Sequence, residues 1–226
     1  SFRDYGGLLL AGAFFGGGLA FWHLSLDNTN VANATLFANA GPIFIVVFGW
    51  LLFRQRVTMT FLGGMAIAIA GAACLVGGTL SLRPENLLGD AYGLATAVFF
   101  ASYLMALERL RTTFSTATAM LWTSIGTAGV LLPLALATGE PMIPETAFGW
   151  SMLLALAVVS QVAGLGMVVY ALAHLPVSFA SIGLLLEPIA VMVMGIVILG
   201  EGLSPWQIAG AAIILSGIYV ARRGGT

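Results

Sequence analysis

The sequence has very little charge. Only 8% of its 226 residues are Asp, Glu, Lys or Arg, whereas 60% are hydrophobic and the mean hydropathy is +1.03. A typical soluble domain has about 25% charged residues. Lysine is absent, all eight basic residues are arginines, and the net charge is −1, so there is no electrostatic footprint for nucleic acid. The composition predicts an integral membrane protein with almost no residues left for a soluble domain.

Residue types that carry several common chemistries are also scarce. The single cysteine, Cys74, excludes a disulfide within the chain. The two histidines and nine acidic residues form no cluster with metal-ligand spacing, so no metal site is expected. An ATP-binding Gly-rich loop requires a lysine that this chain lacks, which excludes primary transport by the chain alone. We therefore expect no cofactor and no enzyme activity.

Long apolar runs make up most of the chain. Each is close to the length of about 20 residues that crosses a bilayer as a helix, and short connectors hold most of the charge. The eight runs are residues 8–24, 31–53, 60–78, 91–107, 116–137, 150–172, 177–199 and 207–221. The expected fold is an all-α integral membrane protein with eight transmembrane helices.

The connectors differ in charge on the two sides of the membrane. If the chain crosses the membrane at each run, seven of the eight arginines lie on one side. Arginine and lysine collect in cytoplasmic loops, so this side is expected to be cytoplasmic. The C-terminus is then cytoplasmic and Glu140 lies outside.

An internal repeat relates two parts of the chain. Residues 22–72 align without a gap on residues 168–218, at an offset of 146, with eleven identities that include Pro42 with Pro188 and Gly64 with Gly210. The matched helices run in opposite directions in the topology above. This pattern indicates an inverted-topology repeat, which is common in secondary transporters.

The second copy of the repeat has two helices ahead of its matching trio, and the first copy has none. We therefore expect ten helices in two inverted five-helix halves, with two helices preceding Ser1. The predicted domains are residues 1–80, a first repeat that lacks its first two helices, and residues 88–223, a second repeat with five helices.

The second copy resembles the EamA-type transporters of the drug/metabolite transporter superfamily. The resemblance rests on the LLLEP sequence of Leu184–Pro188, on Leu199-Gly200-Glu201 followed by Leu203-Ser204, and on the stretch from Gly210 through Gly217 to Val220. The first copy departs from this pattern, because Gly41 replaces the glutamate and Arg54-Gln55-Arg56 replaces Gly-Glu-X. The resemblance implies two inverted five-helix halves around a central substrate cavity. It also implies export of amino acids and related metabolites across a bacterial inner membrane.

Glu187 is the sharpest candidate for a functional residue. It lies near the middle of the run of residues 177–199, where a charge costs ~2.5–3.5 kcal/mol on insertion scales. Two interpretations are open: a cavity-facing group that binds substrate or a proton, or a carboxyl that holds its helix against a neighbour. Pro188 removes a backbone donor and frees the Leu184 carbonyl. Pro188 and its repeat counterpart Pro42 are candidate gating or kink residues.

Neutral polar side chains in the apolar runs complete the candidate site. Amide and hydroxyl groups bind zwitterions without a full charge, although any one of them is better explained as an interhelical hydrogen bond. The predicted substrate-binding residues are Glu187, Asn33, Asn39, Ser160, Gln161 and Tyr103.

The function predicted from these features is secondary transport. We expect a multi-pass protein of the bacterial inner (plasma) membrane that exports small metabolites, foremost amino acids, by alternating access. The predicted partners are the small-molecule substrate, membrane lipid and protons as candidate coupling ions. The alternative is a non-transporting membrane scaffold or assembly protein. An intramembrane protease is disfavoured, because no Ser–His pair shares a depth and both candidate aspartates, Asp27 and Asp90, are expected in loops.

Overall fold

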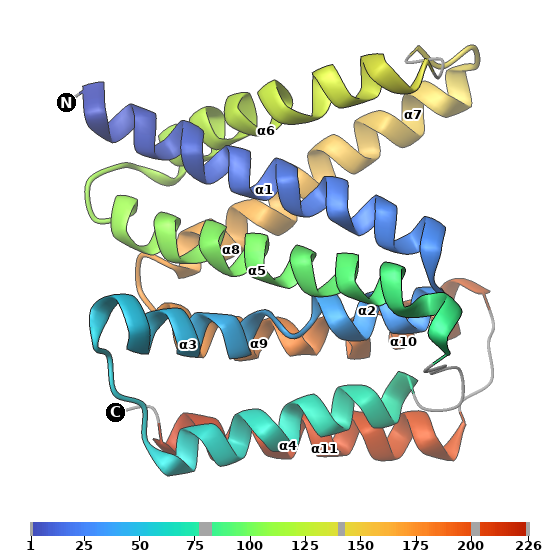
Figure 1. The fold of residues 1–226 in the computed structure, drawn as a ribbon. Coiled ribbons are helices and arrows are strands. Elements are labelled where there is room, and N and C mark those ends of the chain that lie inside the picture. Colours follow the sequence, from blue (N-terminus) through green and yellow to red (C-terminus); the bar gives the residue numbers. More distant parts are fainter. Residues whose placement is uncertain (1, 77–82, 140–142, 200–203, 225–226) are drawn as a thin grey trace. The chain divides into compact units, whose positions relative to one another are not determined.

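A computed structural model describes residues 2–76, 83–139, 143–199 and 204–224. All regular secondary structure in these ranges is helical (Figure 1). The α-helices are α1 (Phe2–Asn28), α2 (Val31–Ala38), α3 (Gly41–Phe53), α4 (Met59–Val76), α5 (Leu87–Leu110), α6 (Thr116–Thr138), α7 (Ala147–Ala155), α8 (Gly166–Ala171), α9 (Val177–Gly183), α10 (Glu187–Leu199) and α11 (Pro205–Gly224). Two 3₁₀ turns, η2 (Pro84–Asn86) and η4 (Leu184–Leu186), and one π-helical segment, η3 (Leu156–Leu165), complete the described elements.

Six helical stretches within the described ranges are long and apolar enough to cross a membrane. They are Asp4–Asn28, Val31–Phe53, Pro84–Leu110, Thr116–Thr138, Ala147–Ala171 and Val177–Ile198. The remaining two predicted runs also coincide with helices: α4, whose apolar part is shorter, and α11, whose last turn holds Arg222 and Arg223. The all-α prediction is confirmed for the described chain, and six of the eight predicted spans meet the criteria of length and composition.

The chain folds as two compact units. The first comprises Ser1–Ala20 and Ser102–Pro176, and the second comprises Phe21–Ala101 and Val177–Thr226. Helices α1 and α5 each contribute one part to either unit. Both units therefore draw on both predicted repeats, because each unit combines segments that are distant in the sequence.

In the first unit, α1 and α6 approach closely at glycines. A Cβ atom added at Gly12 would lie 2.0 Å from the Thr123 carbonyl oxygen, and the Thr127 hydroxyl donates to the Gly12 carbonyl over 2.9 Å. Arg111 ties the connector after α5 to the last turns of α8, since its Nε donates to the Val169 carbonyl over 3.0 Å. Backbone contact and one half-buried arginine thus hold this unit together.

In the second unit, α4 and α11 lie side by side (Figure 1). Glycines bring the two backbones into contact, and we call this contact the glycine seam. A Cβ atom added at Gly64 would lie 2.2 Å from the Ala221 nitrogen, and one added at Gly217 would lie 2.4 Å from the Ala68 nitrogen. Small residues permit such close packing of membrane helices.

The glycine seam is antiparallel and follows the sequence repeat. Besides the contact between Ala68 and Gly217, Gly71 lies against Ile214. The repeat offset of 146 converts the first pair into the second, since residue 68 corresponds to residue 214 and residue 71 to residue 217. Within the second unit, α4 and α11 therefore pack antiparallel through contacts that the offset of 146 residues relates to one another.

The starts of these two helices are capped in the same way. The Phe61 N–H donates to the Thr58 hydroxyl over 3.1 Å, and the Gln207 N–H donates to the Ser204 hydroxyl over 3.3 Å. Hydroxyl side chains satisfy N–H groups that the first helical turn leaves without a partner. Thr58 and Ser204 are also separated by 146 residues, so the repeat extends to the caps.

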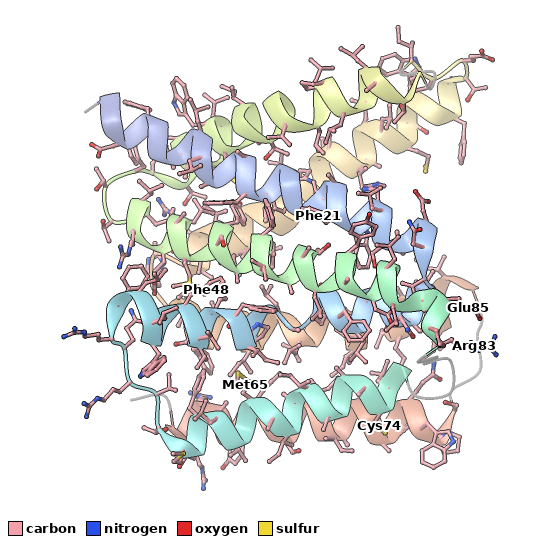
Figure 2. All side chains as sticks on the ribbon, in the orientation of Figure 1. Phe21, Phe48, Met65, Cys74, Arg83 and Glu85 are labelled. Carbon is pink, nitrogen blue, oxygen red and sulfur yellow. The ribbon has the colours of Figure 1, made fainter. Side chains whose placement is uncertain are left out.

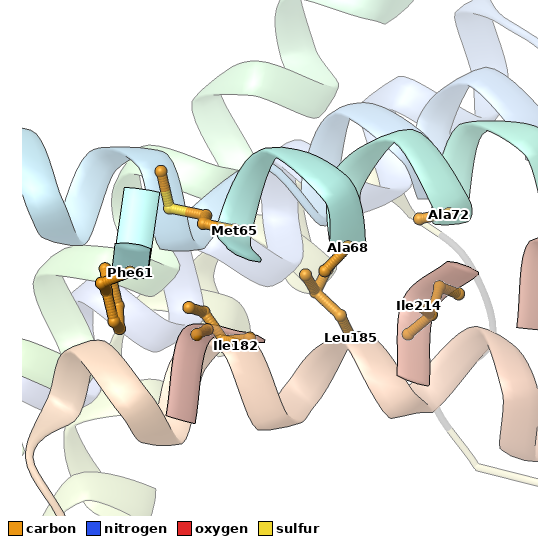
Figure 3. Close-up of a cluster of buried hydrophobic side chains, with 8 residues drawn as sticks. Phe61, Met65, Ala68, Ala72, Ile182, Leu185 and Ile214 are labelled. Carbon is orange, nitrogen blue, oxygen red and sulfur yellow. The ribbon is translucent and has the colours of Figure 1, made fainter. Parts of the chain in front are cut away.

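A cluster of buried apolar side chains joins the seam to α9 and η4 (Figure 3). Ile182 and Leu185 come from the second repeat and pack against α4, where Met65 and Ala68 belong to the cluster. The complete set is Phe61, Met65, Ala68, Ala72, Ile182, Leu185, Ile214 and Ala221. This cluster fixes the position of the turn that carries Glu187.

Candidate functional site

The helix of residues 31–53 is interrupted before Pro42. At the junction, Asn39 and Ala40 separate α2 from α3. Two backbone hydrogen bonds there join residues three apart in the sequence, as in a 3₁₀ turn, and not four apart as in an α-helix. The Ala40 N–H donates to the Phe37 carbonyl over 3.1 Å, and the Ile43 N–H donates to the Ala40 carbonyl over 3.0 Å. Pro42 has no N–H, and its ring excludes a regular helix through this point, which accounts for the break.

The helix of residues 177–199 is interrupted at the corresponding place. The 3₁₀ turn η4 separates α9 from α10, and the Glu187 N–H donates to the Leu184 carbonyl. Pro188 has no N–H to donate to the Leu184 carbonyl, but this carbonyl accepts a hydrogen bond from the Glu187 N–H instead. Our expectation that the Leu184 carbonyl is left free is therefore wrong. The helices after the two breaks, α3 and α10, begin at Gly41 and Glu187, which are 146 residues apart.

Consecutive side chains at η4 lie in different environments. Leu185 is only 1% exposed and contacts the buried cluster (Figure 3), and Pro188 is also buried. The Glu187 side chain, by contrast, is exposed. Within the described residues, no hydrogen bond or ion pair of its carboxylate is found. An ionisable group inside a span needs water, a ligand or a polar partner. The cavity-facing and the packing interpretations of Glu187 both stay predictions.

Asn33 belongs to a buried hydrogen-bonded cluster. It is 0% exposed, and its Nδ2 donates to Asp90 Oδ1 over 2.9 Å. The Thr29 hydroxyl donates to the same oxygen over 2.9 Å, and nearby the Ser25 hydroxyl donates to the Gly89 carbonyl over 2.7 Å. The Asp90 cluster, made of Thr29, Asn33 and Asp90, thus joins α2 to the first turn of α5.

Asp90 was not among the predicted site residues, and its expected place in a loop is wrong. It lies in the first turn of α5 and is 5% exposed, and Asp27 lies in the last turn of α1. A carboxylate at a helix N-terminus is stabilised by the helix dipole. The neighbouring Gly89 permits the close approach of α5 to the end of α1, because a Cβ atom there would lie 2.5 Å from the Asn28 carbonyl carbon.

Removal of the Asp90 carboxylate is expected to destabilise the protein. In Asp90→Ala, the Asn33 amide and the Thr29 hydroxyl lose their common acceptor, and a buried donor without a partner costs about 1–3 kcal/mol. Thermal unfolding in detergent should show this loss, and a double-mutant cycle with Asn33→Ala should show coupling of about 0.5–3 kcal/mol. The exposed Asp27 provides the control variant Asp27→Ala. Additive effects of Asp90→Ala and Asn33→Ala would contradict the cluster.

Asn39 occupies the first interruption itself. Its side-chain Nδ2 and its backbone N–H both donate to the Thr35 carbonyl, each over 3.0 Å. The side chain is half-buried and caps the end of α2. Asn39 therefore stabilises the break that positions α3.

The other predicted residues lie in the first unit. Ser160 and Gln161 belong to the π-helical segment η3, with the Ser160 side chain exposed and that of Gln161 half-buried. Such wide turns occur frequently at functional sites. Tyr103, by contrast, is 0% exposed; its ring centroid lies 4.9 Å from that of Phe15, and its hydroxyl faces Thr123. Tyr103 packs in the interior of this unit.

Five of the predicted residues belong to the second unit. Asn39 and Pro42 lie at the first interruption, Glu187 and Pro188 lie at the second, and Asn33 holds α2 against α5. No group of three or more metal-ligating side chains occurs within the described ranges.

Comparison with known proteins gives a family match. The model of a family described as the EamA-like transporter family matches residues 1–77 and 87–223. A solved structure, named only as the crystal structure of a protein, superposes with a TM-score of 0.76 at 22% sequence identity, over 96% of this chain and 88% of that chain. At this level of sequence identity, the similarity shows a shared fold alone. No curated protein gave a match. The family model covers nearly the whole sequence and confirms the resemblance seen in its motifs, so the chain belongs to the EamA-like transporter family.

Proposed function

We propose that this membrane transporter exports small polar metabolites, foremost amino acids, across a bacterial inner membrane by alternating access. The family supplies the transporter class. The finer proposal rests on the matched helix interruptions before Gly41 and Glu187, together with the exposed carboxylate of Glu187. Discontinuous helices form the substrate sites of several secondary transporters.

An amino acid offers groups that suit this arrangement. Its ammonium group is a partner for the Glu187 carboxylate, with a charge-assisted hydrogen bond. Its carboxylate is favoured near the positive N-terminal end of a half-helix, such as α3. Protons are the alternative ligand of Glu187, in which case they couple to substrate movement.

The proposed transport mechanism also uses the inverted repeat. The antiparallel glycine seam and the matched caps of α4 and α11 support two inverted halves. In such transporters one half moves against the other around a central site. We infer that Pro42 and Pro188 let the half-helices tilt during this movement.

Transport by the purified chain tests the proposal directly. Proteoliposomes are loaded with a panel of labelled amino acids, and efflux is measured with and without a pH gradient. We expect saturable transport of at least one amino acid, well above that of protein-free liposomes. Binding without transport for every substrate would favour the alternative of a membrane scaffold.

The proposed topology predicts a labelling pattern. In a Cys74→Ala background, Glu140→Cys should react with an impermeant maleimide in intact cells, because the face without the arginine excess is outside. Gly225→Cys should react only after permeabilisation. Labelling of Gly225→Cys but not of Glu140→Cys in intact cells would contradict the orientation.

A further inference from the structure

Four exposed arginines gather at one end of the second unit. The Thr58 hydroxyl donates to the Gly224 carbonyl, which holds the connector between α3 and α4 against the end of α11. This contact brings together the arginine end, which we define as Arg54, Arg56, Arg222 and Arg223. Neither the connector of residues 54–58 nor the last turn of α11 contains an acidic residue. Within the described residues, none of the four arginines forms an ion pair.

Arg54 adopts a backbone conformation that normally belongs to glycine. Its φ is 54° and its ψ is 25°, and it is the one non-glycine residue with positive φ in the described ranges. Glycine adopts this left-handed conformation without the steric cost of a Cβ atom. The second repeat has Gly200 at the corresponding sequence position. The backbone alone therefore calls for glycine, and an arginine here points to a use for its side chain.

Arg223 is held in place by an aromatic residue. Its guanidinium lies 4.7 Å from the centroid of the Tyr219 ring and also donates to the Tyr219 hydroxyl. Tyr219 is 55% exposed and Trp50, at the end of α3, is 64% exposed. Such aromatic side chains are enriched where a membrane protein meets lipid headgroups. The arginine end thus lies beside side chains suited to the membrane interface.

We propose that the arginine end binds the phosphate headgroups of anionic phospholipids. Planar guanidinium groups bind phosphate oxygens in bidentate fashion. The flanking side chains of Leu51, Leu52 and Met59 are exposed and apolar, which suits the acyl chains of the same lipid. A phospholipid therefore satisfies both chemistries, whereas free phosphate satisfies only one. Bound lipid bridges the connector and α11 and reinforces the Thr58–Gly224 contact.

Lipid titration of the full chain tests this proposal. The protein is purified in a neutral detergent, and phosphatidylglycerol or phosphatidylcholine is added while the melting temperature is measured. We expect phosphatidylglycerol to raise the melting temperature more than phosphatidylcholine does. Each Arg→Gln substitution at the arginine end should lower the apparent affinity for phosphatidylglycerol about fivefold. The control is Arg83→Gln, because Arg83 pairs with Glu85 at 3.3 Å (Figure 2) and should leave the affinity unchanged.

Two further results separate lipid binding from its rivals. Arg54→Gly relieves the left-handed backbone and should fold well, yet it should still lose affinity for phosphatidylglycerol. An unchanged affinity for phosphatidylglycerol in this variant would show that the Arg54 side chain does not bind the lipid. A second variant has all four arginines changed to glutamine. If phosphatidylglycerol still raises its melting temperature as much as that of the wild type, the proposal is wrong. An equal stabilisation of the wild type by millimolar inorganic phosphate would also overturn the proposal, because the surface would then bind the free anion.

Discussion

Glu187→Gln is expected to keep the fold and to lose most of the transport. Glutamine retains the shape of the side chain and one acceptor oxygen, but it has no negative charge and does not exchange a proton. If the carboxylate binds a substrate ammonium, the variant loses a charged hydrogen bond of about 1.5–3 kcal/mol. The half-saturation concentration for efflux from proteoliposomes should then rise by about tenfold to a hundredfold.

Proton coupling predicts a different result for the same variant. Substrate binding survives, but a pH gradient no longer drives accumulation. Glu145→Gln is the matched control, because Glu145 is also exposed but lies in the connector before α7. If Glu187→Gln transports normally at every pH tested and Glu187→Leu lowers the thermal stability, Glu187 serves packing and both functional interpretations are wrong.

Gly64→Leu is expected to disrupt the second unit. The added Cβ atom would lie 2.2 Å from the Ala221 nitrogen and 2.7 Å from the Gly217 carbonyl oxygen, and backbone atoms cannot move aside as a flexible side chain does. Overpacking typically costs 1–3 kcal/mol and sometimes more, and we expect about 3 kcal/mol or more here because the obstructing atoms belong to the backbone of α11. The melting temperature in detergent should fall sharply.

The neighbouring residue provides the control for this experiment. A Cβ atom at Gly63 has no atom of the protein within 4 Å, so Gly63→Leu introduces the same side chain one position away without a clash. Its melting temperature should stay close to that of the wild type. Equal losses in Gly63→Leu and Gly64→Leu would mean that a large side chain anywhere in this part of α4, and not a clash at the glycine seam, accounts for the effect.

Much of the helical framework could be predicted because it depends on local patterns. Apolar runs predicted where the helices lie, and aligned glycines predicted close packing of the kind found between Gly64 and Ala221. The prolines at residues 42 and 188 coincide with breaks because the loss of an N–H acts within one helical turn. These effects operate between residues that are close in the sequence or equivalent in the repeat.

The environment of individual side chains was harder to predict. Tyr103 and Asn33 occur in apolar runs, and such a run does not show whether a polar side chain lines a cavity or packs in the interior. In the structure both side chains are 0% exposed. Asp90 resembled a loop residue, because nothing in the sequence shows that Thr29 and Asn33 donate to it. The division into two units also depends on contacts between distant segments, which no local pattern records.

The glycine seam has a consequence for biosynthesis. Translation completes α4 at Val76 long before α11 begins at Pro205, and at roughly 5–20 residues per second this interval is on the order of ten seconds. Throughout that interval the glycine face of α4 lacks the helix that covers it in the folded unit. The second unit can close only after α11 has been synthesised, so a chain released before that point keeps the glycine face of α4 uncovered.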